Sequence, residues 1–305
     1  MKIENVGDLR VLLATARHGS LSAAGRELEL TPAACSAMLK RLEAQLGARL
    51  FVRSTRALRL TAEGEILLSY AQRAIEMLEE GVSQVGAGTA NLSGSIRVGA
   101  PSDLSREFLL RLFDEFIAQH PEVKIALSIS DTLHDLHRDA LDLVLRYGNL
   151  TDSQLIARKL VQTRRVACAT PAYFAKYGKP EHPEDLVKHN CISLHIAGKR
   201  ETRWLFERYE SGKLSQQCEV RIEGNRSVND GALAHDWAMS GQGIVYKSAL
   251  DVHRDLQRGN LVPAFSDWLG QAYTLHAIYP GNRFVPTRVR ALIEHLQAGF
   301  AEFPE

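Results

Sequence analysis

Residues 19–64 read GSLSAAGRELELTPAACSAMLKRLEAQLGARLFVRSTRALRLTAEG. Near the middle of this stretch Thr31 can cap the free amides of a helix, and Pro32 suits the first helical position because it has no N–H to leave unpaired. The pair predicts a helix that begins at Pro32 and ends before Gly47. A shorter helical pattern starts after Ser20. Two helices joined by so short a turn predict a helix-turn-helix.

The segments on either side extend this module. Apolar residues recur at three- and four-residue steps from Ile3 to Ala16, which predicts another helix over that range. Residues 50–60 alternate apolar with basic or polar side chains and predict a two-stranded wing. From Thr61 a long helix is predicted, whose apolar stripe of nearly 3.5-residue period favours a partner helix. Residues 86–94 have the composition of a linker.

The second helix of the helix-turn-helix has small and polar side chains at its amino end. A recognition helix needs such residues because its backbone must approach base edges in the major groove. Ala33, Ser36 and Ala37 meet this requirement, and Lys40 lies one turn further on. Arginines on the wing can contact phosphates or an adjacent minor groove. They are Arg53, Arg56 and Arg59. A basic surface that contacts only solvent is the alternative for each residue taken singly.

The length and charge of the chain limit its class. At 305 residues it exceeds the usual size of one domain, so two or three compact units are expected. Residues 1–60 hold ten Lys and Arg against five Asp and Glu, which indicates a polyanionic partner for that part alone. No apolar run is long enough for a membrane span, and residues 1–11 do not read as a secretory signal. We therefore expect a cytoplasmic protein without membrane contact.

From residue 94 onward, strand and helix patterns alternate. Short apolar strands connected by helices predict a largely parallel sheet, and residues 94–305 suit two small α/β lobes. The strand candidates are residues 96–98, 123–129, 141–145, 166–169, 191–194, 243–246 and 272–278. A closing helix is predicted over residues 285–300.

Residues 19–64 resemble the DNA-binding signature of LysR-type transcriptional regulators, with matching residue types and spacing over more than forty positions. The shared features are Ser22-Ala23-Ala24, Thr31-Pro32-x-Ala34-x-Ser36, Leu42-Glu43, Leu46-Gly47, Leu50-Phe51-x-Arg53 and Leu60-Thr61-x-x-Gly64. The resemblance covers essentially the full chain. It includes Asp142-Leu143, Ala169-Thr170-Pro171-Ala172-Tyr173, His182-Pro183-Glu184-Asp185-Leu186 and Gly241-Gln242-Gly243-Ile244.

The resemblance implies an α+β multidomain fold. Its parts would be a winged helix-turn-helix DNA-binding domain (1–60), a linker or dimerisation helix with a hinge (61–93), and a two-lobed α/β effector-binding domain of the type 2 periplasmic-binding-protein kind (94–305). A small molecule would bind between lobe 1, at about 94–164 and 269–305, and lobe 2, at about 165–268. The resemblance also implies a homodimer or homotetramer that binds an interrupted palindrome in double-stranded DNA near a promoter. Contact with RNA polymerase at that promoter is implied as well.

The DNA contacts transferred from the family are Thr31, Ala33, Ser36, Lys40, Arg53 and Arg56. Two positions depart from the family pattern. Cys35 stands where Val is usual, and Ala37 stands where many members carry Arg or Gln. These departures weaken the case for direct base readout at position 37.

The effector site is predicted where strands end. In open α/β sheets ligands bind beyond the carboxyl ends of strands, where helix amino termini offer free amides to anions. The candidate effector-binding residues are Pro101, Ser102, Asp131, Arg146 and Tyr147 in lobe 1 and Asn229, Asp230, Gly243 and Tyr246 in lobe 2. Arg146 could bind a ligand carboxylate through a bidentate pair of hydrogen bonds. A salt bridge within its own lobe is the alternative.

Two other patterns receive simpler interpretations. His134 and His137, with Asp131 and Asp135, have a spacing that could ligate a metal, but a solvated helix face is the favoured interpretation. Residues 86–88 lack the third glycine and the preceding strand of a nucleotide-binding fingerprint, so they read as linker. We expect neither a metal site nor a cofactor other than the effector.

The cysteines raise the question of a redox sensor. Cys168 and Cys218 could form a peroxide-sensing pair, as in redox members of the family. Residues 228–240, where those sensors carry reactive cysteines, contain none. Buried inert thiols are therefore the favoured interpretation.

The sequence thus predicts an effector-responsive transcriptional regulator and not an enzyme. The competing hypothesis is a cytoplasmic small-molecule enzyme or solute binder built on the two-lobed fold. No nucleophile–base motif, metal signature or phosphate loop supports that hypothesis, and it leaves the winged module unexplained.

Overall fold

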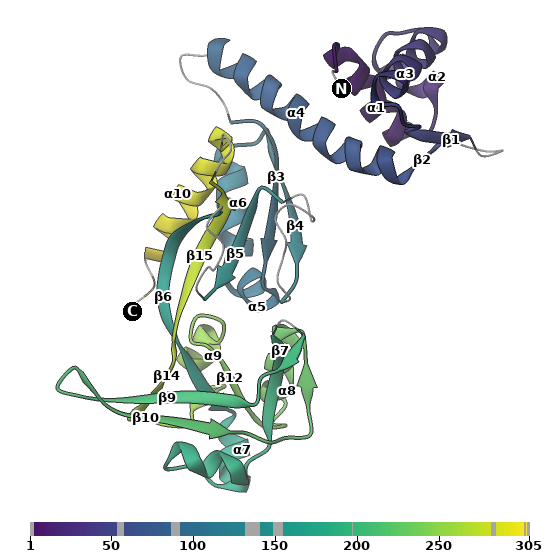
Figure 1. Cartoon of the computed structure of the whole chain (residues 1–305). Helices are drawn as coiled ribbons and strands as arrows, with labels where there is room; N and C mark the ends of the chain where they lie inside the picture. The colour runs from purple at the N-terminus through teal and green to yellow at the C-terminus, as the bar shows by residue number, and fades with distance from the viewer. Residues whose placement is uncertain are drawn as a thin grey trace. The chain divides into compact units, whose positions relative to one another are not determined.

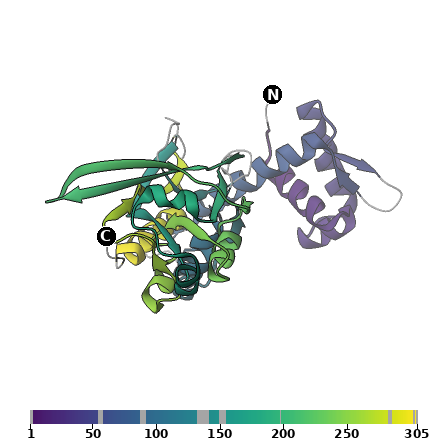
Figure 2. The same cartoon turned by 90° about the horizontal axis from the view of Figure 1, so that it is seen from below.

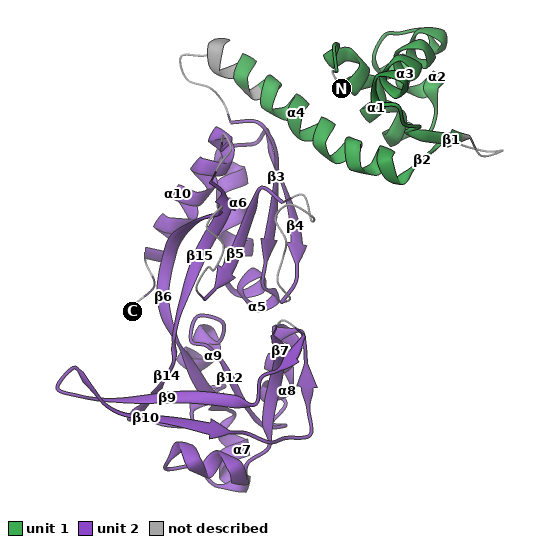
Figure 3. Ribbon diagram, viewed as in Figure 1, with its two compact units in different colours: residues 1–91 green, residues 92–305 purple. Residues whose placement is uncertain are grey.

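The computed structural model describes residues 3–53, 58–86, 92–131, 141–148, 155–196, 198–281, 285–301 and 303. The chain divides into two compact units, Met1–Asn91 and Leu92–Glu305, which are coloured separately in Figure 3. None of the helices in the described part of the chain has the length and apolar character that a membrane crossing requires.

The first unit has the predicted order of a winged helix-turn-helix followed by a long helix (Figure 1). Its elements are α1 (Val6–His18), α2 (Leu21–Glu27), α3 (Pro32–Leu46), β1 (Phe51–Arg53), β2 (Leu58–Leu60) and α4 (Ala62–Gly86). The hydroxyl of Thr31 accepts a hydrogen bond from the Ala34 N–H at 3.1 Å, so the predicted cap of α3 forms. The wing strands β1 and β2 pair antiparallel.

The first helix begins later than the sequence pattern predicts. The side chain of Asn5 accepts a hydrogen bond from the Gly7 N–H at 2.8 Å and caps α1 at Val6, which leaves Ile3 outside the helix. The turn between α2 and α3 is close-packed. A Cβ on Gly25 would lie only 2.5 Å from the Leu30 carbonyl oxygen, so this position requires glycine.

Helices α1, α3 and α4 and the wing enclose the core of the first unit. Its buried residues are Leu9, Leu12, Leu39, Leu42, Leu50, Phe51, Ala71 and Ile75. An ion pair between a buried carboxylate and a half-exposed arginine adds to this packing. The Asp8 carboxylate of α1 is fully buried and accepts a hydrogen bond from Arg41 Nε at 2.8 Å and a second one from Arg41 Nη2. The Arg41 side chain therefore links α3 to α1.

The second unit is an α/β structure, as predicted, but its main sheet is mixed and not largely parallel, because β6 and β15 run antiparallel to their neighbours. Its elements are β3 (Gly94–Ala100), α5 (Ser102–Leu104), the π-helix η1 (Ser105–Leu109), α6 (Leu110–Gln119), β4 (Val123–Ile129), β5 (Leu143–Tyr147), β6 (Leu155–Ala169), α7 (Pro171–Tyr177), the 3₁₀ helix η2 (Pro183–Lys188), β7 (Cys191–Ile196), β8 (Lys199–Arg200), β9 (Arg203–Glu210), β10 (Lys213–Arg221), β11 (Ser227–Val228), α8 (Gly231–Met239), β12 (Ile244–Ser248), α9 (His253–Arg258), β13 (Val262–Pro263), β14 (Trp268–Gly270), β15 (Ala272–Pro280) and α10 (Thr287–Ala301). The main sheet has the order β11-β7-β12-β6-β15-β5-β3-β4.

Two long antiparallel strands connect the lobes of this unit. β6 pairs with β15 from Leu155 opposite Pro280 to Arg164 opposite Ala272, and β6 then continues into lobe 2 to pair with β12. We call the part of the unit that contains β3, β4 and β5 lobe 1, and the part that contains β7, β11 and β12 lobe 2. The sequence pattern predicted only residues 166–169 of β6, so most of this strand was missed.

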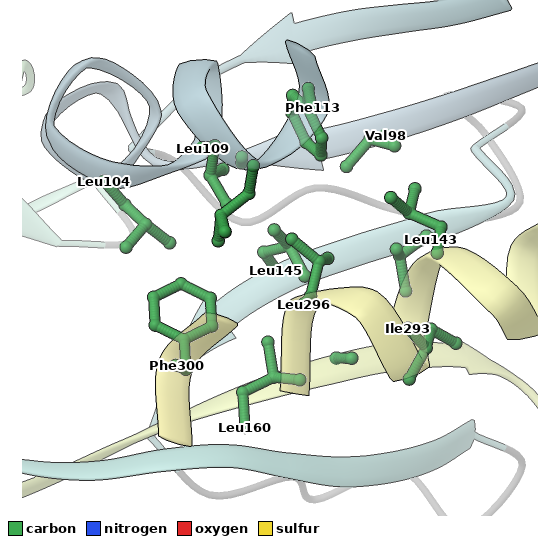
Figure 4. Close-up of a cluster of buried hydrophobic side chains, with 14 of the residues drawn as sticks. Val98, Leu104, Leu109, Phe113, Leu143, Leu145, Leu160, Ile293, Leu296 and Phe300 are labelled. Atoms are coloured by element: carbon green, nitrogen blue, oxygen red, sulfur yellow. The ribbon is translucent and has the colours of Figure 1, made fainter. Parts of the chain in front are cut away.

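Each lobe has its own apolar core. In lobe 1, α6 and α10 pack their buried side chains on the sheet (Figure 4). Residues drawn there include Val98, Leu109, Phe113, Leu145, Leu160, Leu296 and Phe300. In lobe 2, Trp204 and Phe206 of β9 pack against Tyr246 of β12, with ring centroids 5.1 Å apart in both pairs.

A long hairpin on lobe 2 was not predicted. β9 and β10 pair antiparallel, β14 joins them on the β9 side, and the hairpin extends from the rest of the second unit (Figure 2). Most side chains of β10 are exposed. The strand is consequently rich in polar residues and carries little of the apolar alternation on which strand prediction depends.

Candidate functional site

The first candidate surface is the amino-terminal half of α3. Thr31, Ala33, Ala37 and Lys40 are exposed there, and Ser36 is half-buried. Residues three and four positions apart lie on one helix face, so the side chains at 33, 36, 37 and 40 share a surface. Up to Lys40 this surface has no bulky side chain, which leaves the helix backbone free to approach a base pair.

The wing supplies part of the second predicted set. Arg59 of β2 is exposed and lies opposite Val52 of β1. Arg53 is the last residue of β1, and its side chain lies outside the described residues, as does the whole of Arg56.

The second candidate site is a cavity of about 160 Å³ between the lobes of the second unit. Predicted effector residues that line it are Pro101, Asp131, Arg146, Tyr147, Asn229 and Tyr246. The cavity is also lined by residues that no local sequence pattern indicates, among them Asp103, Arg165, His195, Lys247, Asp251 and Tyr273. Aromatic rings beside a few convergent polar groups are typical of a small-molecule site.

A single carboxylate connects the lobes beside this cavity. Asp131, which follows β4, accepts hydrogen bonds from the Ser102 N–H at 2.8 Å, from the Ser102 hydroxyl at 2.5 Å and from the Gly231 N–H at 2.5 Å. The Ser102 hydroxyl oxygen also accepts from the Ala232 N–H at 3.1 Å. Ser102 and Gly231 begin α5 and α8, so this Asp131 bridge places one negative charge at two helix amino termini.

A buried ion pair forms a second connection between the lobes. Lys247 is 3% exposed and Asp103 is 4% exposed. The Lys247 ammonium contacts the Asp103 carboxylate and donates to the Gly231 carbonyl oxygen at 2.8 Å. Burial lowers the pKa of Lys247 to about 8, against the opposing effect of the Asp251 carboxylate. A Cβ on Gly231 would lie 2.8 Å from the Lys247 ammonium, so the close approach of α8 requires glycine there.

A tyrosine forms a third connection. The Tyr147 hydroxyl donates a hydrogen bond to Asp251 at 2.7 Å. Burial raises the pKa of Tyr147 well above its ordinary value, and burial also raises the pKa of Asp251. The Tyr147 ring stacks on Tyr273 with centroids 4.6 Å apart, which forms an aromatic wall of the cavity.

The cations of the cavity differ in whether they are paired. Arg165 binds Glu201 through two hydrogen bonds of 2.5 and 2.7 Å. Arg146, in contrast, forms no hydrogen bond or ion pair with any residue that the structure describes. The alternative prediction, a salt bridge between Arg146 and a residue of its own lobe, is therefore not met by any described residue. The Nε2 atom of His195 is likewise buried with no hydrogen-bond partner in the described part of the chain. Neither side chain is occupied by a described residue, and both line the cavity.

Three predicted effector residues do not line the cavity. The N–H and hydroxyl groups of Ser102 are used in the Asp131 bridge. Asp230 caps α8 by accepting a hydrogen bond from the third helical N–H at 2.8 Å. Gly243 packs directly against Asn190, and its neighbourhood in the sheet has no room for a ligand.

The residues of the alternative metal site and the alternative cysteine pair have the following surroundings in the structure. His134, Asp135 and His137 lie outside the described residues, and Asp131 is held in hydrogen bonds. Cys168 is buried, and burial raises the pKa of its thiol to about 12. Burial also raises the pKa of Cys218. A protonated thiol is a poor nucleophile, which favours inert cysteines.

The chain matches two family models. Residues 6–65 match the bacterial regulatory helix-turn-helix protein, lysR family, and residues 89–301 match the LysR substrate binding domain. The chain is 33% identical over 300 residues to the HTH-type transcriptional regulator PtxR of Pseudomonas aeruginosa, a match that covers 98% of this chain and 94% of that protein. It is 28% identical to the HTH-type transcriptional activator TtdR of Escherichia coli, with 95% and 92% covered.

The solved structures agree with these relatives. CrgA, a LysR-type transcriptional regulator from Neisseria meningitidis, superposes with a TM-score of 0.60 at 27% identity and covers 99% of this chain and 100% of that one. The relatives are named as regulators, in agreement with the prediction that the chain is not an enzyme. The chain therefore belongs to the LysR family of DNA-binding transcriptional regulators, and its second unit is the family's effector-binding domain.

Proposed function

We propose that this regulator binds an interrupted palindrome near a promoter and changes promoter output when a small carboxylate binds between its lobes. We choose a carboxylate because the Arg146 guanidinium has no partner among the described residues. Arg165 and Lys247, which line the same cavity, are both paired with carboxylates. A planar guanidinium binds carboxylates through two parallel hydrogen bonds. His195 can add a hydrogen bond, and Tyr273 offers apolar surface to the ligand body.

The surface of α4 supports a dimer that reads two half-sites. Large apolar side chains on this helix remain exposed by 43% to 74%. They are Ile66, Tyr70, Met77, Leu78 and Val82. Such a surface favours a partner helix from a second copy, and a two-fold dimer presents its two α3 helices to the halves of a palindrome. Assembly to a tetramer and contact with RNA polymerase extend this proposal by family resemblance.

The Asp131 bridge provides a route from effector to lobe arrangement. A carboxylate bound to Arg146 enters the cavity that Asp131 also lines, so it places a second negative charge near the bridge. An effector acts only through different affinities for different lobe arrangements, and a coupling of about 1–3 kcal/mol changes promoter occupancy several-fold.

Replacing Arg146 by Ala is expected to weaken carboxylate binding by about 10- to 100-fold, because charge-assisted hydrogen bonds contribute about 1.5–3 kcal/mol. Thermal shift with a panel of small aliphatic and aromatic carboxylates first identifies a binder, and calorimetry then compares wild type with the variant. Arg221→Ala, on the exposed face of β10, is the matched control and should bind like wild type. Equal affinities for wild type and Arg146→Ala would remove Arg146 from the site.

Replacing Lys40 by Ala is expected to weaken binding to every DNA sequence by a similar factor. Lys40 is exposed on the α3 surface that we place against the DNA, where its ammonium can contact a phosphate. The slope of log K against log salt should fall by about 0.9 for each phosphate contact that is lost. Fluorescence anisotropy over a series of salt concentrations measures it. Lys213→Ala, at the start of β10 in the second unit, should leave the slope unchanged. An unaltered slope in Lys40→Ala would exclude Lys40 from the phosphate contacts.

A further inference from the structure

A cluster of metal-ligand side chains lies in lobe 2 outside the effector cavity. His182, Glu184 and Cys218 each place a ligand atom within 4.8 Å of the others. His182 Nδ1 and Glu184 Oε2 are 3.8 Å apart. None of the three lines the cavity, and none takes part in the connections between the lobes.

The cluster joins two elements that are distant in sequence. His182 and Glu184 flank Pro183 at the start of η2, whereas Cys218 lies in β10 of the long hairpin. His182 and Glu184 belong to the stretch His182-Pro183-Glu184-Asp185-Leu186 that resembles the family, whereas Cys218 lies outside it. Cys218 comes to them through the packing of β10 against η2.

The His182 ring is held in place. Its centroid lies 4.9 Å from that of Trp268 at an interplanar angle of 83°. Its backbone N–H donates to Asp185 at 3.0 Å, which fixes the peptide that carries it. Among the described residues, its Nδ1 atom accepts a single hydrogen bond, a long one of 3.5 Å from the Glu184 N–H. An imidazole with a fixed ring and a weakly engaged nitrogen requires little reorganisation to bind a metal.

We propose that His182, Glu184 and Cys218 form a binding site for Zn²⁺ in which solvent completes the coordination. Imidazole, thiolate and carboxylate together are a ligand set that Zn²⁺ prefers. Tetrahedral Zn²⁺ with bonds of about 2.0–2.3 Å separates its ligand atoms by about 3.3–3.8 Å, so atoms that now lie within 4.8 Å of one another must approach by at most about 1.5 Å. Glu184, whose side chain is 79% exposed, has the freedom to make this adjustment.

Binding at this site has a chemical and a structural consequence. The Cys218 thiol gives its proton to solvent and the sulfur binds Zn²⁺ as a thiolate, with no change of oxidation state. The bound ion then cross-links η2 to the β9–β10 hairpin. Lobe 2 would thereby respond to Zn²⁺ independently of a ligand in the cavity.

Titration of the full chain with Co²⁺, a spectroscopic substitute for Zn²⁺, tests the proposal. A thiolate ligand produces a sulfur-to-cobalt charge-transfer absorption in the near ultraviolet, which oxygen and nitrogen ligands alone do not produce. We expect wild type to show this band, and added Zn²⁺ to abolish it by displacement. The reduced protein must be free of any histidine tag.

Variants distinguish this site from binding elsewhere on the surface. Cys218→Ser should abolish the band. His182→Asn, whose side-chain oxygen can replace Nδ1 as the helix-capping acceptor, should weaken Zn²⁺ binding at least about tenfold, the scale seen for disturbed metal sites. Glu184→Gln should weaken it, whereas Glu181→Gln, an exposed carboxylate next to the cluster, should not. Absence of the band in wild type, or its persistence in Cys218→Ser, would overturn the proposal.

Discussion

Replacing Asp103 by Ala is expected to reduce the free energy of unfolding of the second unit by about 3–5 kcal/mol, the cost of removing one partner of a buried ion pair. The Lys247 ammonium would remain buried, and the partners left to it among the described residues would be the Gly231 carbonyl oxygen and the more distant Asp251. Urea unfolding followed by tryptophan fluorescence measures the loss, because all three tryptophans lie in the second unit.

The double replacement Asp103→Leu with Lys247→Met is the control for this experiment. It removes both charges and keeps similar volume, so it should recover most of the lost stability. Arg111→Ala, which breaks an exposed ion pair with Glu115 on α6, should cost less than about 1 kcal/mol. A loss below about 1 kcal/mol for Asp103→Ala would show that the pair does not hold the lobes together.

Replacing Ser36 by Leu is expected to reduce preference for the operator over unrelated DNA by at least about 100-fold. Ser36 lies on the α3 face that also carries Ala33 and Lys40, and a branched side chain there keeps the helix from reaching base edges, each of which contributes about 1–3 kcal/mol of discrimination. Competition binding with operator and random duplexes measures the ratio.

A matched variant separates this effect from damage to the helix. Ala44→Leu makes the same kind of addition at an exposed position two turns further along α3 and should leave the preference near that of wild type. Circular dichroism should show both variants folded. Normal operator preference in Ser36→Leu would mean that this face of α3 does not read the bases.

Local sequence patterns were sufficient to predict the first unit. The Thr31 cap, the glycine at position 47 and the alternation of the wing are signals within a few residues, and the structure confirms the elements they predict. β6 escaped prediction because Arg158, Lys159, Arg164 and Arg165 interrupt its apolar pattern. Charged residues are tolerated there because the strand runs from one lobe to the other, and Arg165 has a partner in Glu201.

The cavity was only partly predictable for a different reason. Strand ends placed Asp131, Arg146 and Tyr147 correctly beside it, because the carboxyl ends of strands meet at one edge. Asp103 and Lys247 are 144 positions apart, and no local pattern pairs them. One signal was available: Lys247 interrupts an apolar run in β12, where every residue is buried. A lysine in such a strand requires a buried carboxylate nearby.

Whether α3 reads an operator can be measured as the affinity of the 305-residue protein for DNA upstream of its own gene, by fluorescence anisotropy at about 0.15 M salt. If α3 reads an operator there, the protein should bind that duplex at least about 1,000-fold more tightly than a random duplex of equal length. Equal affinity for the two duplexes would mean that the protein recognises no operator at that locus.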